Sequence, residues 1–363
     1  MNPILDIYTD YLLASFSQTT ATGLSNLVNG AISHDQVTRF LSNKPPTSKD
    51  LWRVVKPFVR QIQSEKGVLI IDDSIEEKPY TDENDIICWH YDHSKNCHIK
   101  GINFVSCLYQ NTFQGQAISL PVGFELVAKT EKYLDKKTQQ EKRRSPTSKN
   151  EMGREMLQQA VKNQVLFSYV LFDIWFASAE NLSFIKQDLK KDVVCPIKTN
   201  RKVALSYEDK RAGRWVAVAT LENKANEVLE IYLEGVEFPL LLSKQIFTNE
   251  DKADGILYLI SSDTTLTFTQ MTTMYQRRWN VEVYHKSLKQ NVSLSKSPTQ
   301  TETTQTTHFF AALCGYIKLE RLKIETKTNH FALKTKLYVN ALQAAFQTLK
   351  ELNPIQVAVQ TSS

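Results

Sequence analysis

The stretch YQRRWNVEVYHKSLK, Tyr275 to Lys289, combines an aromatic hydroxyl, several cations and one carboxylate. At about 100° per residue on a helix, five of these side chains fall within an arc of roughly 80°. Because Mg²⁺ binds one or two carboxylates together with phosphate oxygens, this face suits a metal ion held beside a phosphate backbone. A solvated helix face with i,i+4 ion pairs is the alternative that the spacing leaves open. The five residues are Tyr275, Arg278, Glu282, Lys286 and Lys289.

Two earlier apolar runs end in aspartates. GVLIIDDS, from Gly67 to Ser74, predicts a buried strand that closes with Asp72 and Asp73, and VLFSYVLFD closes in the same way with Asp173. Ligands of α/β sheets bind at the carboxyl ends of strands, and adjacent carboxylates there are costly unless a cation or hydrogen bonds compensate. These aspartates are therefore candidate metal ligands. An aspartate after a strand can also be a turn or capping residue.

The amino-terminal part is predicted to be helical. Apolar residues recur at helical spacing over residues 1 to about 65, and Ser33 with Gln36 forms a capping-box pattern after a break at Gly30. The arrangement resembles a helix-turn-helix, in which Arg39 would be among the residues that reach DNA. Ordinary packing of two helices joined by a glycine turn is the alternative.

The middle of the chain predicts strands and a basic loop. Residues 99–127 predict a β-hairpin, and residues 193–262 predict a β-rich insertion. Residues 129–154 predict a flexible basic loop that contacts phosphates or is simply solvated. Within the insertion, Trp215 lies among cations and would stack on a base or pack in the sheet. Asp263 also ends a strand-like run and is a rival candidate ligand.

Composition excludes several classes of protein. The chain has 363 residues, which predicts two or three domains, and its 42% hydrophobic and 23% charged content is typical of globular proteins. No apolar stretch approaches the roughly 18 residues of a membrane span, and the start of the chain lacks a basic signal-peptide region, so we expect a cytoplasmic protein. The five cysteines include no CxxC pair, which argues against a disulfide framework or a zinc ribbon. The net charge of +5 is compatible with nucleic-acid binding.

Two strand-end aspartates, a β-rich insertion and a later helix with a glutamate resemble the DDE transposases of the ribonuclease-H-like superfamily. The spacing from Tyr275 through Arg278 and Glu282 to Lys289 is similar to the Y-(2)-R-(3)-E-(6)-K signature of the insertion sequence four group of bacterial transposases. The resemblance covers about residues 67–325. It implies a metal-dependent nuclease and strand transferase with two Mg²⁺ ions, for which Mn²⁺ can substitute.

The resemblance implies roles for the carboxylates. Asp173 and Glu282 match the second and third metal ligands of the family. The family's first ligand precedes a Ser or Thr by two positions, which favours Asp72, but Asp73 stays a candidate because strand parity puts only one of the pair on the active face. Tyr275, Arg278 and Lys289 match the family's contacts to the DNA end, and further candidate DNA-binding residues are Lys286, Trp215, which would hold an extruded base, and Arg39.

The fold class that these observations predict is α/β: a ribonuclease-H-like mixed sheet flanked by helices, with a β-rich insertion and an N-terminal helical domain. We expect a helical DNA-binding domain over 1–66, a catalytic core over 67–190 and 266–325, the insertion over 191–265, and a C-terminal helical region over 326–363. The core would be formed by two parts of the chain that the insertion separates.

The predicted function is cut-and-paste transposition, which comprises cleavage at the transposon ends and strand transfer into target DNA. The partners would be double-stranded DNA, namely the terminal inverted repeats and the target, and a second copy of the chain in a dimeric synaptic complex. We expect the protein near the bacterial nucleoid, with no membrane involved. Two alternatives remain open at this point: a structure-selective DNA nuclease of the same fold, and a non-catalytic DNA-binding relative that represses transposition.

Overall fold

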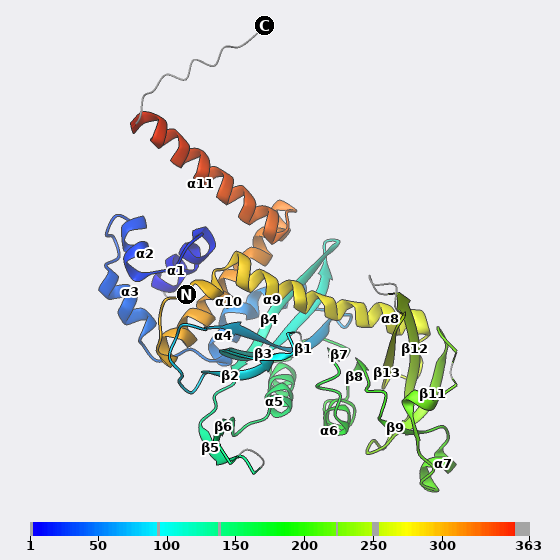
Figure 1. The fold of residues 1–363 in the computed structure, drawn as a ribbon. Helices are drawn as coiled ribbons and strands as arrows, with labels where there is room; N and C mark the ends of the chain where they lie inside the picture. Colours follow the sequence, from blue (N-terminus) through cyan, green and yellow to red (C-terminus); the bar gives the residue numbers. More distant parts are fainter. Residues whose placement is uncertain (1–2, 93–94, 137–138, 223, 249–253, 353–363) are drawn as a thin grey trace.

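The computed structural model describes residues 3–92, 95–136, 139–222, 224–248 and 254–352. Its centre is a mixed sheet in which β3 is antiparallel to β1, β2 and β4, whereas β1, β7 and β8 run parallel to one another (Figure 1). This is the ribonuclease-H-like arrangement that the sequence predicts. The strands are β1 (Val68–Glu77), β2 (Ile87–Asp92), β3 (Cys97–Phe113), β4 (Gln116–Leu126), β7 (Tyr169–Phe172) and β8 (Asp192–Pro196).

The register of the central strands places the predicted carboxylates side by side. Ile71 of β1 pairs with Phe172 of β7, so the residues that follow each of them, Asp72 and Asp173, lie at the same edge of the sheet. The β3–β4 hairpin predicted from the sequence is confirmed, and its two turn residues, Gln114 and Gly115, both have positive φ. This is the backbone that a two-residue hairpin turn requires.

The β-rich insertion extends the same sheet. Its strand β13 pairs antiparallel with β8, so the order continues outward as β8, β13, β12, β11, β9 and β10. Strand β8 itself pairs in parallel with β7, although its residues lie within the insertion predicted over 191–265. The added elements are β9 (Lys202–Ala204), α7 (Tyr207–Arg211), β10 (Val216–Ala217), β11 (Val228–Leu233), β12 (Leu240–Thr248) and β13 (Asp254–Ser261).

The basic stretch after β4 is not an irregular loop, and this expectation was wrong. It contains a two-stranded hairpin of β5 (Glu131–Leu134) and β6 (Glu141–Arg144). Ion pairs join Glu131 to Arg144 at 3.0 Å and Lys132 to Glu141 at 2.8 Å across the two strands. Opposite charges on facing strands stabilise a hairpin that has no apolar face, which is why hydrophobic periodicity did not indicate it.

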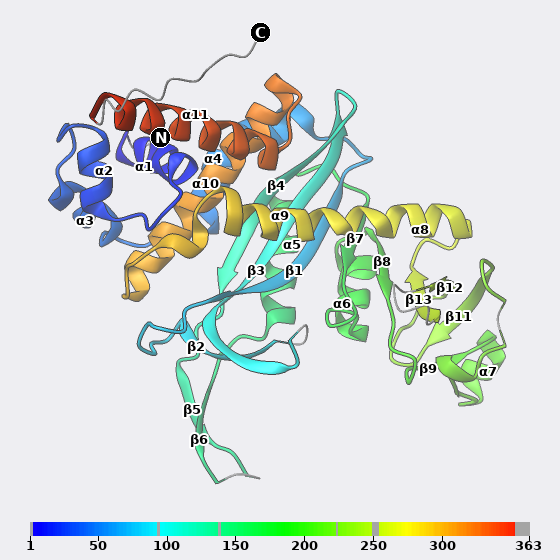
Figure 2. The ribbon, with the colours of Figure 1, turned by 45° about the horizontal axis from the view of Figure 1, so that its top comes forward.

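Helices cover both faces of the central sheet. α9 (Asn280–Asn291) and α10 (Glu302–Thr326) lie on one face, and α5 (Lys149–Lys162) and α6 (Ala179–Ser183) lie on the other (Figures 1 and 2). The predicted helix over 268–290 begins as α8 (Phe268–Gln276), passes through a short 3₁₀ turn at Arg277–Trp279 and continues as α9. Figure 2 shows this nearly continuous helix crossing the central strands.

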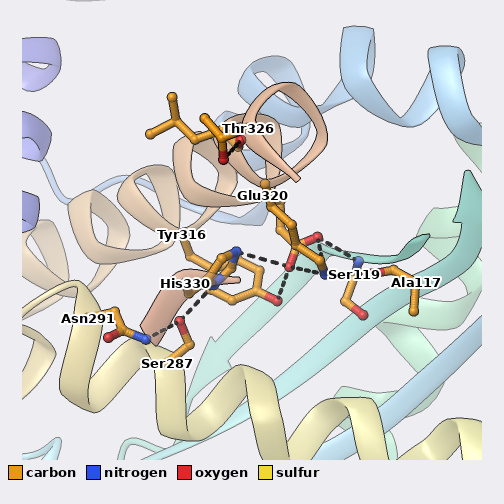
Figure 3. Close-up of polar contacts among 10 residues, drawn as sticks. Ala117, Ser119, Ser287, Asn291, Tyr316, Glu320, Thr326 and His330 are labelled. Carbon is orange, nitrogen blue, oxygen red and sulfur yellow. Dashed lines mark hydrogen bonds and ion pairs between the residues drawn. The ribbon is translucent and has the colours of Figure 1, made fainter. Parts of the chain in front are cut away.

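A buried polar network holds the back of α9 (Figure 3). Ser287 of α9 contacts His330 Nδ1 at 2.9 Å, where α11 (His330–Leu352) begins. On α10, Tyr316 donates to the Glu320 carboxylate, whose other oxygen accepts the Ser119 amide of β4 at 3.2 Å. His330 Nε2 lies 3.3 Å from the same carboxylate without the geometry of a hydrogen bond. The network thus joins α9, α10, α11 and the sheet.

The amino-terminal helices share the hydrophobic core of the sheet and α10. They are α1 (Pro3–Ala14), α2 (Ala21–Leu27), α3 (His34–Leu41) and α4 (Ser48–Ile62). The predicted capping box of Ser33 and Gln36 is confirmed at the start of α3. On α1, Tyr8 donates to His308 Nδ1 at 2.9 Å, and His308 Nε2 lies within 3.2 Å of the carbonyl oxygens of Ser293 and Leu294. His308 therefore carries its proton on Nε2.

His308 makes a testable contribution to the pH dependence of stability. Burial lowers the pKa of His308 from 6.5 to about 4, so between these values the unfolded chain binds a proton that the folded chain does not. Folding stability from this residue is complete above pH 6.5 and is lost as pH falls toward 4. When the pH is lowered from 7 to 5, the free energy of unfolding in urea is expected to fall by about 2 kcal/mol less in His308→Gln than in the unmodified protein. Equal losses in the two proteins would contradict this account.

Candidate active site

A cleft of about 790 Å³ opens where the central strands end beneath α9. All four carboxylates predicted from the sequence line this cleft, together with three cations of the signature helix, which comprises residues 275–289. Residues from three separate parts of the chain therefore meet in one place. The carboxylates are Asp72, Asp73, Asp173 and Glu282, and the cations are Arg278, Lys286 and Lys289.

The alternation of β1 sends Asp72 and Asp73 to opposite faces of the sheet. Asp73 accepts hydrogen bonds from Lys149 Nζ of α5 at 2.5 Å and from the Asn103 amide at 3.2 Å. Asp72 lies on the α9 face, where its Oδ2 is 3.8 Å from Arg278 Nη1 and 3.9 Å from His285 Nδ1. Asp73 thus has its own cation, whereas Asp72 points to the helix that carries Glu282.

Asp173 follows β7 in a tight turn. Its Oδ1 accepts the Trp175 amide at 2.9 Å, which is the local bond expected of an aspartate that ends a strand. The side chain also lines the cleft, so the turn role and the ligand role are compatible. Burial raises the pKa of Asp173, and repulsion from Asp73 adds to this effect.

Glu282 and Arg278 form an ion pair one helical turn apart. Arg278 Nη1 lies 3.3 Å from Glu282 Oε1, and its guanidinium stacks 5.6 Å from the centre of the Tyr275 ring. Arg278 therefore stands between the two carboxylates Asp72 and Glu282. Tyr275 is partly buried against the core and supports this guanidinium, and burial raises the Tyr275 pKa to about 12.

The charge balance of the cleft favours a cation beyond those of the protein. Burial raises the pKa of Asp72 well above its ordinary value, and repulsion from Asp173 raises it further. Such a group is destabilising as an anion unless positive charge compensates it. Within the described part of the chain, one group of carboxylate and histidine side chains brings its ligand atoms within 4.8 Å of one another, namely Asp72, Glu282 and His285. The residues present fit a divalent metal ion.

The two lysines of the signature helix occupy different surroundings. Lys289 Nζ donates to the main-chain oxygen of Ile75 on β1 at 2.9 Å and lies where the cleft passes into a neighbouring groove. Lys286 lies 5.3 Å over the ring of Phe331, at the start of α11, and lines the cleft as well. Both ammonium groups are placed at the border of the carboxylate cluster.

Two residues of the cleft were missed in the sequence. His285 lies three residues after Glu282, a spacing that puts both side chains on one helical face, but nothing in the sequence tells which face meets β1. Trp175 is 49% exposed in the cleft, with Lys198 Nζ 4.2 Å from its ring centre. The sequence feature that could have identified Trp175 is its position two residues after Asp173.

Three other candidates lie outside the cleft. Trp215 is half-buried beside β10 of the insertion, and Arg39 is exposed on α3, where its Nε donates to the Asp35 carbonyl of the same helix. Asp263 accepts a hydrogen bond from Tyr169 at 2.6 Å and caps Thr265, so it is a turn residue rather than part of the carboxylate cluster. In the ranges that the structure describes, no helix has the length and apolarity required to cross a membrane.

Curated proteins and solved structures add no support to this site. None of the curated proteins matches the chain at a significant level. A solved structure, the Drosophila P element transposase strand transfer complex, is 13% identical over 48% of this chain and 34% of its own, with a TM-score of 0.25, which is too low to support an argument. The chain thus matches about a third of that protein's length.

Family models give the stronger result. Residues 139–318, which include Asp173 and Glu282, match the model of the transposase DDE domain. Residues 4–226, more than half of the chain, match the DDE superfamily endonucleases and contain Asp72 as well as Asp173. The cleft carboxylates therefore lie inside the matched regions, and the chain belongs to the DDE superfamily of endonucleases and transposases.

Proposed function

We propose that this protein is a cut-and-paste DNA transposase that cleaves DNA at the ends of its element and joins them to target DNA. The observation that supports this most is the meeting of Asp72, Asp173 and Glu282 in one cleft bordered by cations, in a chain of the DDE superfamily. Carboxylates and cations are the side chains that metal-dependent phosphodiester chemistry uses. We further place the chain in the insertion sequence four group, on the basis of its Tyr-Arg-Glu-Lys spacing.

Asp72, Asp173 and Glu282 would hold two divalent ions. These would be Mg²⁺, for which Mn²⁺ can substitute. Such ions, when bound, activate the attacking oxygen and stabilise the leaving oxygen of an in-line phosphoryl transfer. The protein supplies the position of these carboxylates, since strand ends and a packed helix fix them relative to one another. Asp73 would act indirectly, because Lys149 neutralises it on the other face of the sheet.

The cations would hold the DNA. Arg278 can bind the phosphate next to the scissile bond with its planar guanidinium, and Tyr275 would keep that guanidinium in place by stacking. Lys286 and Lys289 at the border of the cleft would contact neighbouring phosphates, which fixes position rather than sequence. Trp175, exposed beside Asp173, is better placed in the cleft than Trp215 to stack on a base near the cut.

The remaining parts of the proposal concern binding partners. We place recognition of the element's ends on the N-terminal helices, including Arg39 on exposed α3. A dimer would bring two ends together. Support for the dimer comes from α11, which extends from the body with exposed apolar side chains such as Leu342, Phe346 and Leu349 (Figure 1).

The proposal is tested with a plasmid that carries the element's own ends around a marker. Purified protein with Mg²⁺ or Mn²⁺ is expected to release the marker fragment and to join its 3′-hydroxyl ends to a second plasmid. Chelation of the metal ions with EDTA should stop both reactions. Cutting without joining would instead favour the structure-selective nuclease, and DNA binding without any cutting would favour the non-catalytic repressor; either result would contradict the proposal.

A further inference from the structure

The metal-binding cluster contains a histidine that the proposed carboxylate set does not use. His285 projects from α9 one turn after Glu282, and it packs edge-on against Phe104 of β3 with ring centres 5.5 Å apart. Its side chain is 9% exposed, and it lines the cleft. The ring is therefore held rigidly in the floor of the site.

The ring nitrogens of His285 lack hydrogen-bond partners among the described residues. Nε2 is buried without any partner, and Nδ1 lies 3.9 Å from Asp72 Oδ2, which exceeds hydrogen-bond distance. A buried polar group without a partner costs free energy. One ligand atom each of His285, Asp72 and Glu282 lies within 4.8 Å of the others, a spacing that a shared cation would bridge.

The chemistry of this ring also fits metal binding. Neutral imidazole has a lone pair free to bind a metal ion, and it binds transition metals in preference to Mg²⁺, which favours oxygen ligands. The packing against Phe104 leaves little freedom for the ring to turn away.

We propose that His285 is a direct protein ligand of one divalent ion, together with Asp72 and Glu282, and that it makes this position selective for Mn²⁺ over Mg²⁺. The inference rests on the metal dependence of the proposed function but concerns a different property, namely which atoms bind the ion. Two carboxylates and one imidazole give the site a charge of −2, which matches a divalent cation. Arg278, now paired with both carboxylates, would be released to bind phosphate.

The test is electron spin-echo spectroscopy of the full-length protein with one equivalent of Mn²⁺ and no DNA. We expect modulation from a directly bound ¹⁴N nucleus, replaced by the ¹⁵N pattern when the protein is grown with ¹⁵N-histidine. His285→Asn should abolish the modulation and weaken Mn²⁺ binding about tenfold or more, with a change in Mg²⁺ affinity of less than about threefold. The control is His308→Asn, a buried histidine outside the cleft, which should retain the signal.

Each outcome bears on the inference. Mn²⁺ that binds in the wild-type protein without nitrogen coupling would overturn it, and this measurement does not depend on whether any variant folds. Equal losses of Mn²⁺ and Mg²⁺ affinity in His285→Asn would overturn the selectivity. If nitrogen coupling is present but DNA is never cut, the ligand assignment stands and the transposase proposal fails. If DNA is cut and joined without nitrogen coupling, the transposase proposal stands and the ligand assignment fails.

Discussion

Asp72→Asn is expected to abolish DNA cleavage and, at the same time, to raise the melting temperature of the metal-free protein. The first effect follows because Asp72 is the carboxylate of β1 that faces Glu282 and His285. Loss of cleavage should reach at least about 10³-fold, which corresponds to about 4 kcal/mol of transition-state stabilisation. The second effect follows because Asp72 is a buried carboxyl group whose pKa is raised by burial and by repulsion from Asp173.

The gain in stability is expected to be on the order of 1 kcal/mol, since a neutral amide of the same shape removes the repulsion. Cleavage of element-end DNA and thermal unfolding without metal measure the two effects on one variant. The matched control is Asp73→Asn, which removes the neighbouring carboxylate but leaves Lys149 without its partner. We expect this control to reduce cleavage by no more than about tenfold and to lower stability. The opposite ranking of the two variants would assign the metal to Asp73.

Glu320→Ala is expected to destabilise the fold by about 3–5 kcal/mol, because it removes the acceptor at the centre of the network behind α9. Glu320 is 2% exposed, and its oxygens accept hydrogen bonds from Tyr316, from the Ser119 amide and from Lys323 (Figure 3). The substitution removes this acceptor from the Tyr316 hydroxyl and the Ser119 amide, which are both buried, and a buried donor without an acceptor is costly.

Urea unfolding at pH 7 measures this loss. Glu325→Ala, an exposed position on the same helix, serves as the control and should change stability by less than about 0.5 kcal/mol. A further result follows from the position of the network. Because it anchors Ser287 of α9 through His330, the Glu320→Ala protein that remains folded should bind Mn²⁺ more weakly than wild type. A loss of stability below about 1 kcal/mol would show that the network is not a major support of the fold.

Local patterns in the sequence predicted those parts of the fold that local physics determines. Ser33 and Gln36 form the predicted capping box, and the turn at Gln114–Gly115 joins the predicted hairpin, since each depends on a few adjacent residues. The β5–β6 hairpin was missed because its stability comes from charge pairs across strands, such as Lys132 with Glu141, which have no apolar periodicity.

The carboxylates of the candidate site were predictable from the sequence, whereas the histidine beside them was not. Glu282 and Asp173 stand out by type and by position after apolar segments, whereas the choice between Asp72 and Asp73 needed the face of β1 on which α9 packs. The same tertiary information identifies His285, since a histidine between Tyr284 and Lys286 could equally have faced the core or solvent. Contacts between distant segments decide such residues, and sequence spacing does not record them.

The most direct test of the central claim is the location of Mn²⁺ in a crystal of the protein, determined from anomalous scattering at the manganese absorption edge. The account predicts an anomalous peak within coordinating distance of Asp72, Glu282 and His285, at the carboxyl end of β1 beneath α9. A peak bound by Asp73 or Asp263 instead, or no peak in the cleft at a saturating Mn²⁺ concentration, would contradict it.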